Sequence, residues 1–261
     1  MHAEVEIDNI VRFDPPAEGA PPRSAHRLDH MWLTRNNIVG FEPASKDTHP
    51  FSVLRSQLLK HTKSSGERVF ALTSVQPANG KTHVAANLAA ILSRIHPTIL
   101  IELDLRRPSV GHRLGLPNDL PGVDDYLFGE ASMREAAIRI DGFDLSVYRA
   151  RRPVANPEKY LASTRLAEMF QALRTDPARP ICIVDTPPGA IHHDDVMLIA
   201  PAIDGIIMVV EEARTAKHAL VETIKSLSPT PVIGSVLNKS VSTRRDTNDY
   251  DYYYASQSYD P

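Results

Sequence analysis

The chain has 261 residues, of which 42% are hydrophobic and 23% charged, so it can bury one large core or two small ones. A net charge of -3 gives no bulk reason to bind nucleic acid, and no such partner is expected. A single cysteine, Cys182, excludes an internal disulfide framework and a multi-cysteine zinc site. The acidic start does not resemble a signal peptide, and no apolar run approaches the roughly 20 residues of a spanning helix, so a cytoplasmic protein is expected.

Composition divides the chain into three predicted parts. Residues 1–45 contain five prolines and predict a flexible N-terminal arm, with a short ordered piece at 31–41. Residues 46–240 predict one folded domain. Residues 241–261 hold five of the eight tyrosines and no Val, Leu, Ile or Met after Val241, which predicts a disordered tyrosine-rich tail.

Apolar runs alternate with helical patterns through the middle of the chain. The predicted strands are 69–73, 98–101, 181–184, 205–210 and 232–237. The predicted helices are 51–59, 84–95, 164–175, 194–200 and 214–226. Near-continuous apolar strands that alternate with helices are typical of a parallel sheet covered on both faces. The predicted fold class is α/β, with a doubly wound, mostly parallel sheet.

A strand-to-helix loop at residues 74–82 ends in Gly-Lys-Thr and carries the strongest chemical signal. Such a loop aims backbone N–H groups and a helix N-terminus at one point, which suits phosphate oxygens. Lys81 would reach the β- and γ-phosphates, and the Thr82 hydroxyl would bind Mg²⁺. Val75 stands where the motif has its first glycine. The expected nucleotide-contacting residues of the loop are Pro77, Ala78, Asn79, Gly80, Lys81, Thr82 and His83.

Carboxylates follow two of the predicted strands. Glu102 and Asp104 lie two residues apart at one strand end, and we expect them to point to the same side, into the crevice at the carboxyl edge of the sheet. Asp185 ends another apolar strand, as does the Mg²⁺-side carboxylate of phosphate-loop NTPases. The three strand ends together are far more specific than any one of them.

With these motifs, residues 50–239 resemble the bacterial tyrosine kinases, the ATPase-derived BY-kinases that regulate capsule and exopolysaccharide synthesis. The resemblance is carried by the loop and its helix through Ala89, the acidic motif with Arg106, the run Val184-Asp185-Thr186-Pro187-Pro188, Asp194, and the terminal Val236-Leu237-Asn238-Lys239. It implies a P-loop NTPase fold related to the partition ATPases, with ATP and Mg²⁺ as cofactors.

The resemblance also implies roles for single residues. Lys81, Glu102, Asp104 and Asp185 would be catalytic, with Thr82, Asp104 and Asp185 at the metal. Glu102 would accept the tyrosine proton, although an exchange of roles between Glu102 and Asp104 stays open. Arg106 would orient the acidic pair beside the nucleotide, and Asn238 would lie beside the adenine. The acceptors, phosphorylated in trans by another copy, would be Tyr250, Tyr252, Tyr253, Tyr254 and Tyr259.

Four features depart from the family pattern. Ala78-Asn79 replaces Gly-Glu in the loop, Glu102 replaces an Asp, and the helix before the first strand keeps only Arg55 of its usual Glu and two Arg, which makes ring assembly by that route doubtful. We also expect no transmembrane activator segment to be fused to the chain. A separate membrane-embedded co-polymerase, or chain-length regulator, is therefore the expected partner, and it would recruit the protein to the inner face of the membrane.

Two other functions remain open. A partition or septum-site ATPase would carry a lysine five positions before Lys81, and Gln76 stands there instead, which disfavours that class. A nucleotide-binding regulatory subunit without turnover would explain Val75, Ala78 and Glu102 as marks of lost catalysis. ATP binding without phosphotransfer would identify it.

Overall fold

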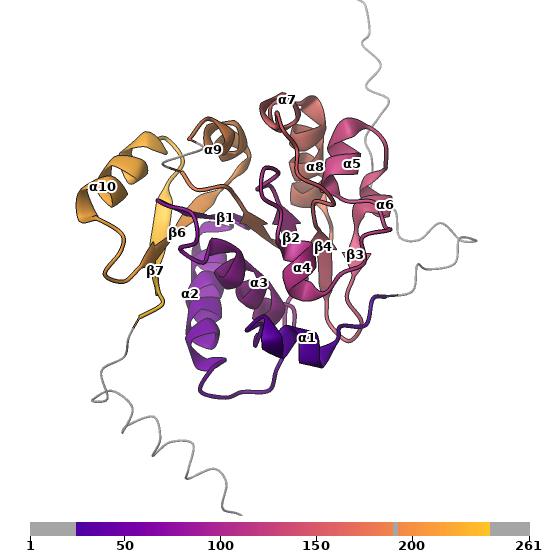
Figure 1. Ribbon diagram of the computed structural model, residues 1–261, viewed down its shortest axis with the longest axis horizontal. Coiled ribbons are helices and arrows are strands. Elements are labelled where there is room, and N and C mark those ends of the chain that lie inside the picture. The colour runs from indigo at the N-terminus through magenta and orange to yellow at the C-terminus, as the bar shows by residue number, and fades with distance from the viewer. Residues whose placement is uncertain (1–24, 190–192, 241–261) are drawn as a thin grey trace, which may run out of the picture.

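A seven-stranded sheet forms the centre of the computed structural model, which describes residues 25–189 and 193–240 (Figure 1). Its strands are β1 (Val69–Ser74), β2 (Thr98–Glu102), β3 (Ile138–Arg139), β4 (Leu145–Tyr148), β5 (Ile181–Asp185), β6 (Gly205–Glu211) and β7 (Val232–Asn238). Their order is β3-β4-β2-β5-β1-β6-β7, and only the β3–β4 pair is antiparallel. The predicted doubly wound α/β fold is confirmed.

Helices cover both faces of the sheet. One face packs against α1 (His30–Arg35), α2 (His49–Ser65), α3 (Lys81–Leu92) and α4 (Val110–Leu114). The other face packs against α5 (Val123–Phe128), α6 (Met133–Ala136), α7 (Glu158–Leu161), α8 (Thr164–Thr175), α9 (His193–Ile199), a short 3₁₀ turn (Ala200–Ala202) and α10 (Lys217–Ser226). Successive residues of β1 alternate between these two cores, because neighbouring side chains of a strand point to opposite faces.

Strand register brings the chemistry-bearing strand ends together. β5 lies between β1 and β2, and Asp185 is level with Leu72 on one side and Glu102 on the other. All three strands run parallel, so their carboxyl ends meet at one edge of the sheet, which is where α/β folds bind ligands.

All five predicted strands and all five predicted helices are present, with ends shifted by three residues or fewer, except that α2 continues to Ser65, six residues beyond its predicted end. The sequence pattern missed β3, β4 and the short helices α1 and α4–α7. These elements have two to six residues, too few to display a helical or strand period.

Residues 26–45, assigned above to the N-terminal arm, pack against the domain. Leu33 and Ile38 are buried among the residues of α3 and its neighbours. The Asn87 side chain accepts the N–H groups of Val39 at 2.7 Å and Gly40 at 2.9 Å, which ties this segment to the helix that follows the phosphate loop. Across the described ranges, no helix is long and apolar enough to span a bilayer.

Candidate active site

The loop between β1 and α3 has the backbone shape of a phosphate-binding turn. Gly80 adopts a left-handed conformation with φ 94° immediately before α3, whose first N–H groups have no partner within the helix. Ala78 is also left-handed, with φ 64°, and so occupies the position where the family has a glycine. Val75, at the position of the missing first glycine, is buried in the core, so it serves packing.

The end of β7 holds this loop from outside. The Asn238 side-chain amide donates to the carbonyl of Asn79 at 2.8 Å, and the Lys239 ammonium donates to the carbonyl of Ala78 at 2.7 Å. Asn79 in turn donates to Glu211 at 3.0 Å, and Lys239 lies 3.3 Å from the same carboxylate. Asn238, expected beside an adenine, is thus placed against the loop backbone.

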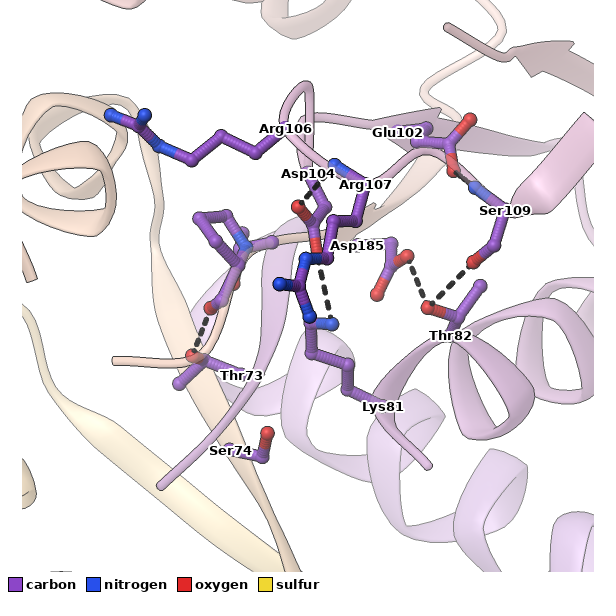
Figure 2. Close-up of polar contacts among 12 residues, drawn as sticks. Thr73, Ser74, Lys81, Thr82, Glu102, Asp104, Arg106, Arg107, Ser109 and Asp185 are labelled. Carbon is purple, nitrogen blue, oxygen red and sulfur yellow. Dashed lines mark hydrogen bonds and ion pairs between the residues drawn. The ribbon is translucent and has the colours of Figure 1, made fainter. Parts of the chain in front are cut away.

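The Lys81 ammonium lies at the centre of the site, as Figure 2 shows. It is 2.9 Å from the Asp104 carboxylate, and both side chains are largely buried. Burial alone would lower the pKa of Lys81, but the negative charges of Asp185, Asp104 and Glu102 together raise it above its ordinary value. Lys81 is therefore held as a buried cation with its charge directed at Asp104.

Thr82 and Asp185 form a second polar pair beside it. The Thr82 hydroxyl donates to one Asp185 oxygen at 2.7 Å, while the other Asp185 oxygen is buried with no hydrogen-bond partner (Figure 2). Burial raises the pKa of Asp185 to about 6, although Lys81 and Thr82 favour its ionised form.

This pair fits a magnesium ion. A hydroxyl and a carboxylate are the hard oxygen ligands that Mg²⁺ prefers, and the unpartnered Asp185 oxygen is free to bind the ion or one of its waters. Within the described ranges, no cluster of three or more acidic, histidine or cysteine side chains could hold a metal by itself. The remaining ligands would therefore be phosphate oxygens and water.

Glu102 differs from the expectation that it points with Asp104 into the crevice. Its carboxylate accepts the backbone N–H group of Ser109 (Figure 2). It also accepts those of Val110 at 2.7 Å and Ala150 at 2.9 Å. β2 ends at Glu102 and the chain turns there, so the two-residue alternation no longer applies at Asp104. Glu102 anchors backbone, and Asp104 is the carboxylate that faces Lys81.

Arg106 also lies apart from the acidic pair. Its guanidinium binds Asp195 of α9 with both carboxylate oxygens, at 2.7 and 3.2 Å, and it also binds Glu158 of α7. These two carboxylates raise the pKa of Arg106 above its ordinary value. Arg106 therefore joins the turn after β2 to α7 and α9, and it forms no contact with Asp104.

Other predicted contacts lie around the loop. Pro77 is half-buried and Ala78 exposed at the tip. The His83 ring packs edge-on against Phe51 of α2 at 5.8 Å, and burial together with the charge of Arg113 lowers its pKa. The five predicted acceptor tyrosines lie outside the described residues.

The sequence assigned no role to Ser109, Asp195 and Glu211, and it included Lys239 only as the last residue of the terminal motif. The Ser109 hydroxyl lies 3.4 Å from that of Thr82, and its N–H binds Glu102. Asp195 follows Asp194, which the motif did include, so its charge beside the Pro-Pro turn was the available signal. Glu211 and Ser109 carried none, since each is a single polar residue at an element end.

Comparison with known proteins identifies relatives of this chain and structures with a similar fold. No protein-family model matches the chain. The tyrosine-protein kinase YwqD of Bacillus subtilis is 25% identical over 85% of this chain and 92% of its own length. The tyrosine-protein kinase Wzc of Salmonella typhimurium is 33% identical over 77% of this chain, which spans 28% of that longer protein. The kinase domain of VpsO superposes with a TM-score of 0.69 and 27% identity, covering 82% of this chain and 100% of that domain.

The chain belongs to the bacterial tyrosine kinase family. The fold is also that of the wider P-loop NTPases. The septum-site protein MinD of Pyrococcus horikoshii, solved with Mg-ADP, matches with a TM-score of 0.57 and 19% identity, covering 68% of this chain and 72% of that protein. The family thus accounts for the phosphate loop, the acidic motif and the sheet order together.

Proposed function

We propose that this chain is an ATP-dependent protein tyrosine kinase that phosphorylates the tyrosines at 250–259 of another copy of itself. The observation that carries the proposal is the convergence of two polar pairs, Lys81–Asp104 and Thr82–Asp185, at the carboxyl ends of adjacent strands. Kinship to proteins named tyrosine-protein kinases supports phosphoryl transfer to a phenol.

In the transfer step, the phenol oxygen of a tyrosine attacks the γ-phosphorus of ATP. The bond from that phosphorus to the β–γ bridging oxygen breaks, ADP leaves, and the phenol proton passes to the Asp104 carboxylate. Thr82 and Asp185 would hold Mg²⁺, which would supply neutralisation of the negative charge on the phosphate oxygens. Lys81 stabilises the charge that spreads over the transferred group.

The Lys81–Asp104 pair links nucleotide binding to this step. At 2.9 Å from the ammonium, Asp104 is occupied as an ion-pair partner. A γ-phosphate that attracts Lys81 would relieve Asp104 of this pairing and leave it available to accept a proton. Asp104 therefore takes the role of base in the proposal, which is the exchange with Glu102 left open by the sequence.

A role in exopolysaccharide export is proposed with it. ExoP of Rhizobium meliloti, a succinoglycan biosynthesis transport protein, is 32% identical over 78% of this chain, which spans 26% of ExoP. We propose that a separate membrane-embedded co-polymerase activates the kinase and recruits it to the inner face of the membrane.

Intact-mass measurement after incubation with Mg·ATP tests the proposal. We expect successive phosphate additions that map to the five tail tyrosines, disappear in Lys81→Met, and largely disappear when those tyrosines are changed to Phe while ATP hydrolysis persists. Phosphate on residues outside 250–259 would contradict the substrate assignment. ATP binding without phosphate addition, even with the cytosolic segment of a co-polymerase present, would instead establish a regulatory or switch protein.

A further inference from the structure

Glu211, the last residue of β6, lies at the centre of a polar cluster beside the phosphate loop. One of its carboxylate oxygens accepts the side-chain N–H of Asn79 at 3.0 Å. The same oxygen lies 3.2 Å from the Arg214 guanidinium and 3.3 Å from the Lys239 ammonium. β6 and β7 run side by side at one edge of the sheet, in a register that places Glu211 level with Asn238 (Figure 1). The ends of both strands therefore meet the loop at this carboxylate.

The Asn79 side chain is fully buried and joins the loop to Glu211. Its oxygen accepts the backbone N–H of Gln76 at 3.0 Å, and its nitrogen donates to Glu211. Only one orientation of the amide satisfies both partners, because a backbone N–H can only donate and a carboxylate can only accept. Glu211 therefore fixes the direction of a side chain that spans the beginning of the loop.

Two further hydrogen bonds fix the direction of the loop backbone. The carbonyl of Ala78 accepts the Lys239 ammonium, and the carbonyl of Asn79 accepts the Asn238 amide. In a trans peptide the C=O and N–H groups point in opposite directions, so the N–H groups of Asn79 and Gly80 point away from β7. Neither N–H makes a hydrogen bond within the described part of the chain. Both are available to phosphate oxygens.

This backbone shape needs support from its surroundings. Ala78 has φ 64°, a left-handed conformation that residues with a Cβ seldom adopt. The hydrogen bond from Asn79 and the charge of Lys239 lower the pKa of Glu211 below its ordinary value, so the carboxylate is ionised at neutral pH. It thus holds the two residues that contact the loop at and beside Ala78.

We propose that Glu211 is a positioning residue for nucleotide binding, which holds Asn79 and Lys239 so that the loop presents its N–H groups to phosphate. The proposal rests on the proposed function and deepens it. An acidic residue at position 79 would face the Glu211 carboxylate, so Asn79 and Glu211 form a matched pair. The departure of this loop from the family pattern is then a coupled change at two positions and is no mark of lost catalysis.

Exchanging the donor and the acceptor of this pair tests the proposal. Asn79→Asp keeps the shape of the side chain and its acceptor for Gln76, but it places a second carboxylate against Glu211. We expect the Kd for Mg·ADP, measured by calorimetry, to rise about tenfold. Glu211→Gln keeps an acceptor oxygen for Asn79 and should raise the Kd about two- to threefold.

The double variant of Asn79→Asp and Glu211→Gln restores the hydrogen bond with its polarity reversed, because the glutamine amide can donate to the aspartate. Its Kd should return to within about threefold of the unmodified value. Glu222→Gln makes the same chemical change at an exposed position on α10 and should leave the Kd unchanged. A Kd of the double variant equal to the product of the two single effects, or larger, would overturn the pairing.

Steady-state phosphorylation separates positioning from catalysis. In Asn79→Asp the KM for ATP should rise, while kcat at saturating ATP stays within about twofold, because Lys81 and Asp104 are unchanged. A fall in kcat at an unchanged KM would overturn the proposal. A lower free energy of unfolding with an unchanged Kd would overturn it as well, since it would show a purely structural role.

Failure of this proposal can be told from failure of the proposed function, because binding of Mg·ADP needs no phosphoryl transfer. An unchanged Kd in every variant, in a protein that phosphorylates its tail, would overturn the role of Glu211 alone. The expected changes in Kd, in a protein that adds no phosphate, would support the role of Glu211 and contradict the kinase function.

Discussion

Glu102 and Asp104 are two residues apart and yet belong to different regions of the molecule. Glu102 is enclosed by backbone N–H groups that start α4 and follow β4, whereas Asp104 faces a single buried ammonium. Burial raises the pKa of Glu102 to about 8, and the N–H groups only partly oppose this. Neighbouring carboxylates therefore acquire structural or chemical roles from the groups that they face.

The largest expected effect is on catalysis at Asp104. Asp104→Asn keeps the shape of the side chain but removes the base, so kcat for tail phosphorylation should fall about 10²–10⁴-fold. Glu102→Gln should lower kcat by less than about tenfold, since Glu102 does not face the reacting atoms. Radiolabelled phosphate transfer under saturating Mg·ATP measures both. A greater loss in Glu102→Gln than in Asp104→Asn would return the role of base to Glu102.

For the free energy of unfolding we expect the opposite order, with a larger loss from substitution at Glu102 than at Asp104. In Glu102→Gln an amide nitrogen replaces one oxygen and cannot accept a hydrogen bond, so a buried backbone N–H loses its partner at a cost of about 1–3 kcal/mol. Chemical unfolding of the variant should show this decrease in the free energy of unfolding. Glu130→Gln, at an exposed carboxylate, is the matched control and should change it by less than about 0.5 kcal/mol.

The stability difference should also depend on pH. Because the pKa of Glu102 is raised to about 8 in the folded protein, the folded state keeps a proton that the unfolded chain releases from about pH 4.5 upward. The stabilisation from this group is therefore complete below pH 4.5 and is lost as pH rises towards 8. Unfolding curves should show that the difference in free energy of unfolding between the unmodified protein and Glu102→Gln is smaller at pH 8.5 than at pH 5.5. A difference that grows with pH would contradict the raised pKa of Glu102.

The smallest effect is expected at Ser109, which joins the two regions. Its N–H binds Glu102 and its hydroxyl lies 3.4 Å from Thr82, a long contact. Ser109→Ala should reduce kcat about two- to threefold, the equivalent of about 0.5 kcal/mol, with the free energy of unfolding little changed. Ser109→Thr, which retains the hydroxyl, should remain near the unmodified rate. Equal losses in both variants would show that the side-chain volume matters and the hydroxyl does not.

Much of the fold could be predicted from the sequence because its central strands are long, apolar and bounded by clear turns. For this reason the sequence pattern predicted five strands, which are β1, β2, β5, β6 and β7. β3 and β4 were not predicted, since two and four residues carry too little pattern. For residues 26–45 the sequence indicated only a short ordered piece at 31–41, because the contacts that fix this segment, such as those with Asn87, are distant in sequence.

The sequence predicted which residues belong to the candidate site better than it predicted the contacts that these residues make. Motif spacing placed Lys81, Thr82, Asp104 and Asp185 at one sheet edge, and the structure brings these four together. The direction of Glu102 depended on where β2 ends, which strand propensity does not resolve to a single residue. The direction of Arg106 depended on Asp195, which lies 89 residues away in sequence.

Because hydrogen bonds join the end of β7 to the phosphate loop, the local stability of β7 is coupled to the affinity for nucleotide. β7 is an edge strand whose residues are largely half-buried or exposed, so opening this strand should require less free energy than opening the central strands. Two hydrogen bonds from Asn238 and Lys239 fasten the loop to its end, and a strand that opens releases the loop with it. Hydrogen exchange in β7 and in the loop should therefore rise and fall together, and a nucleotide that orders the loop should slow exchange along the whole of this edge strand.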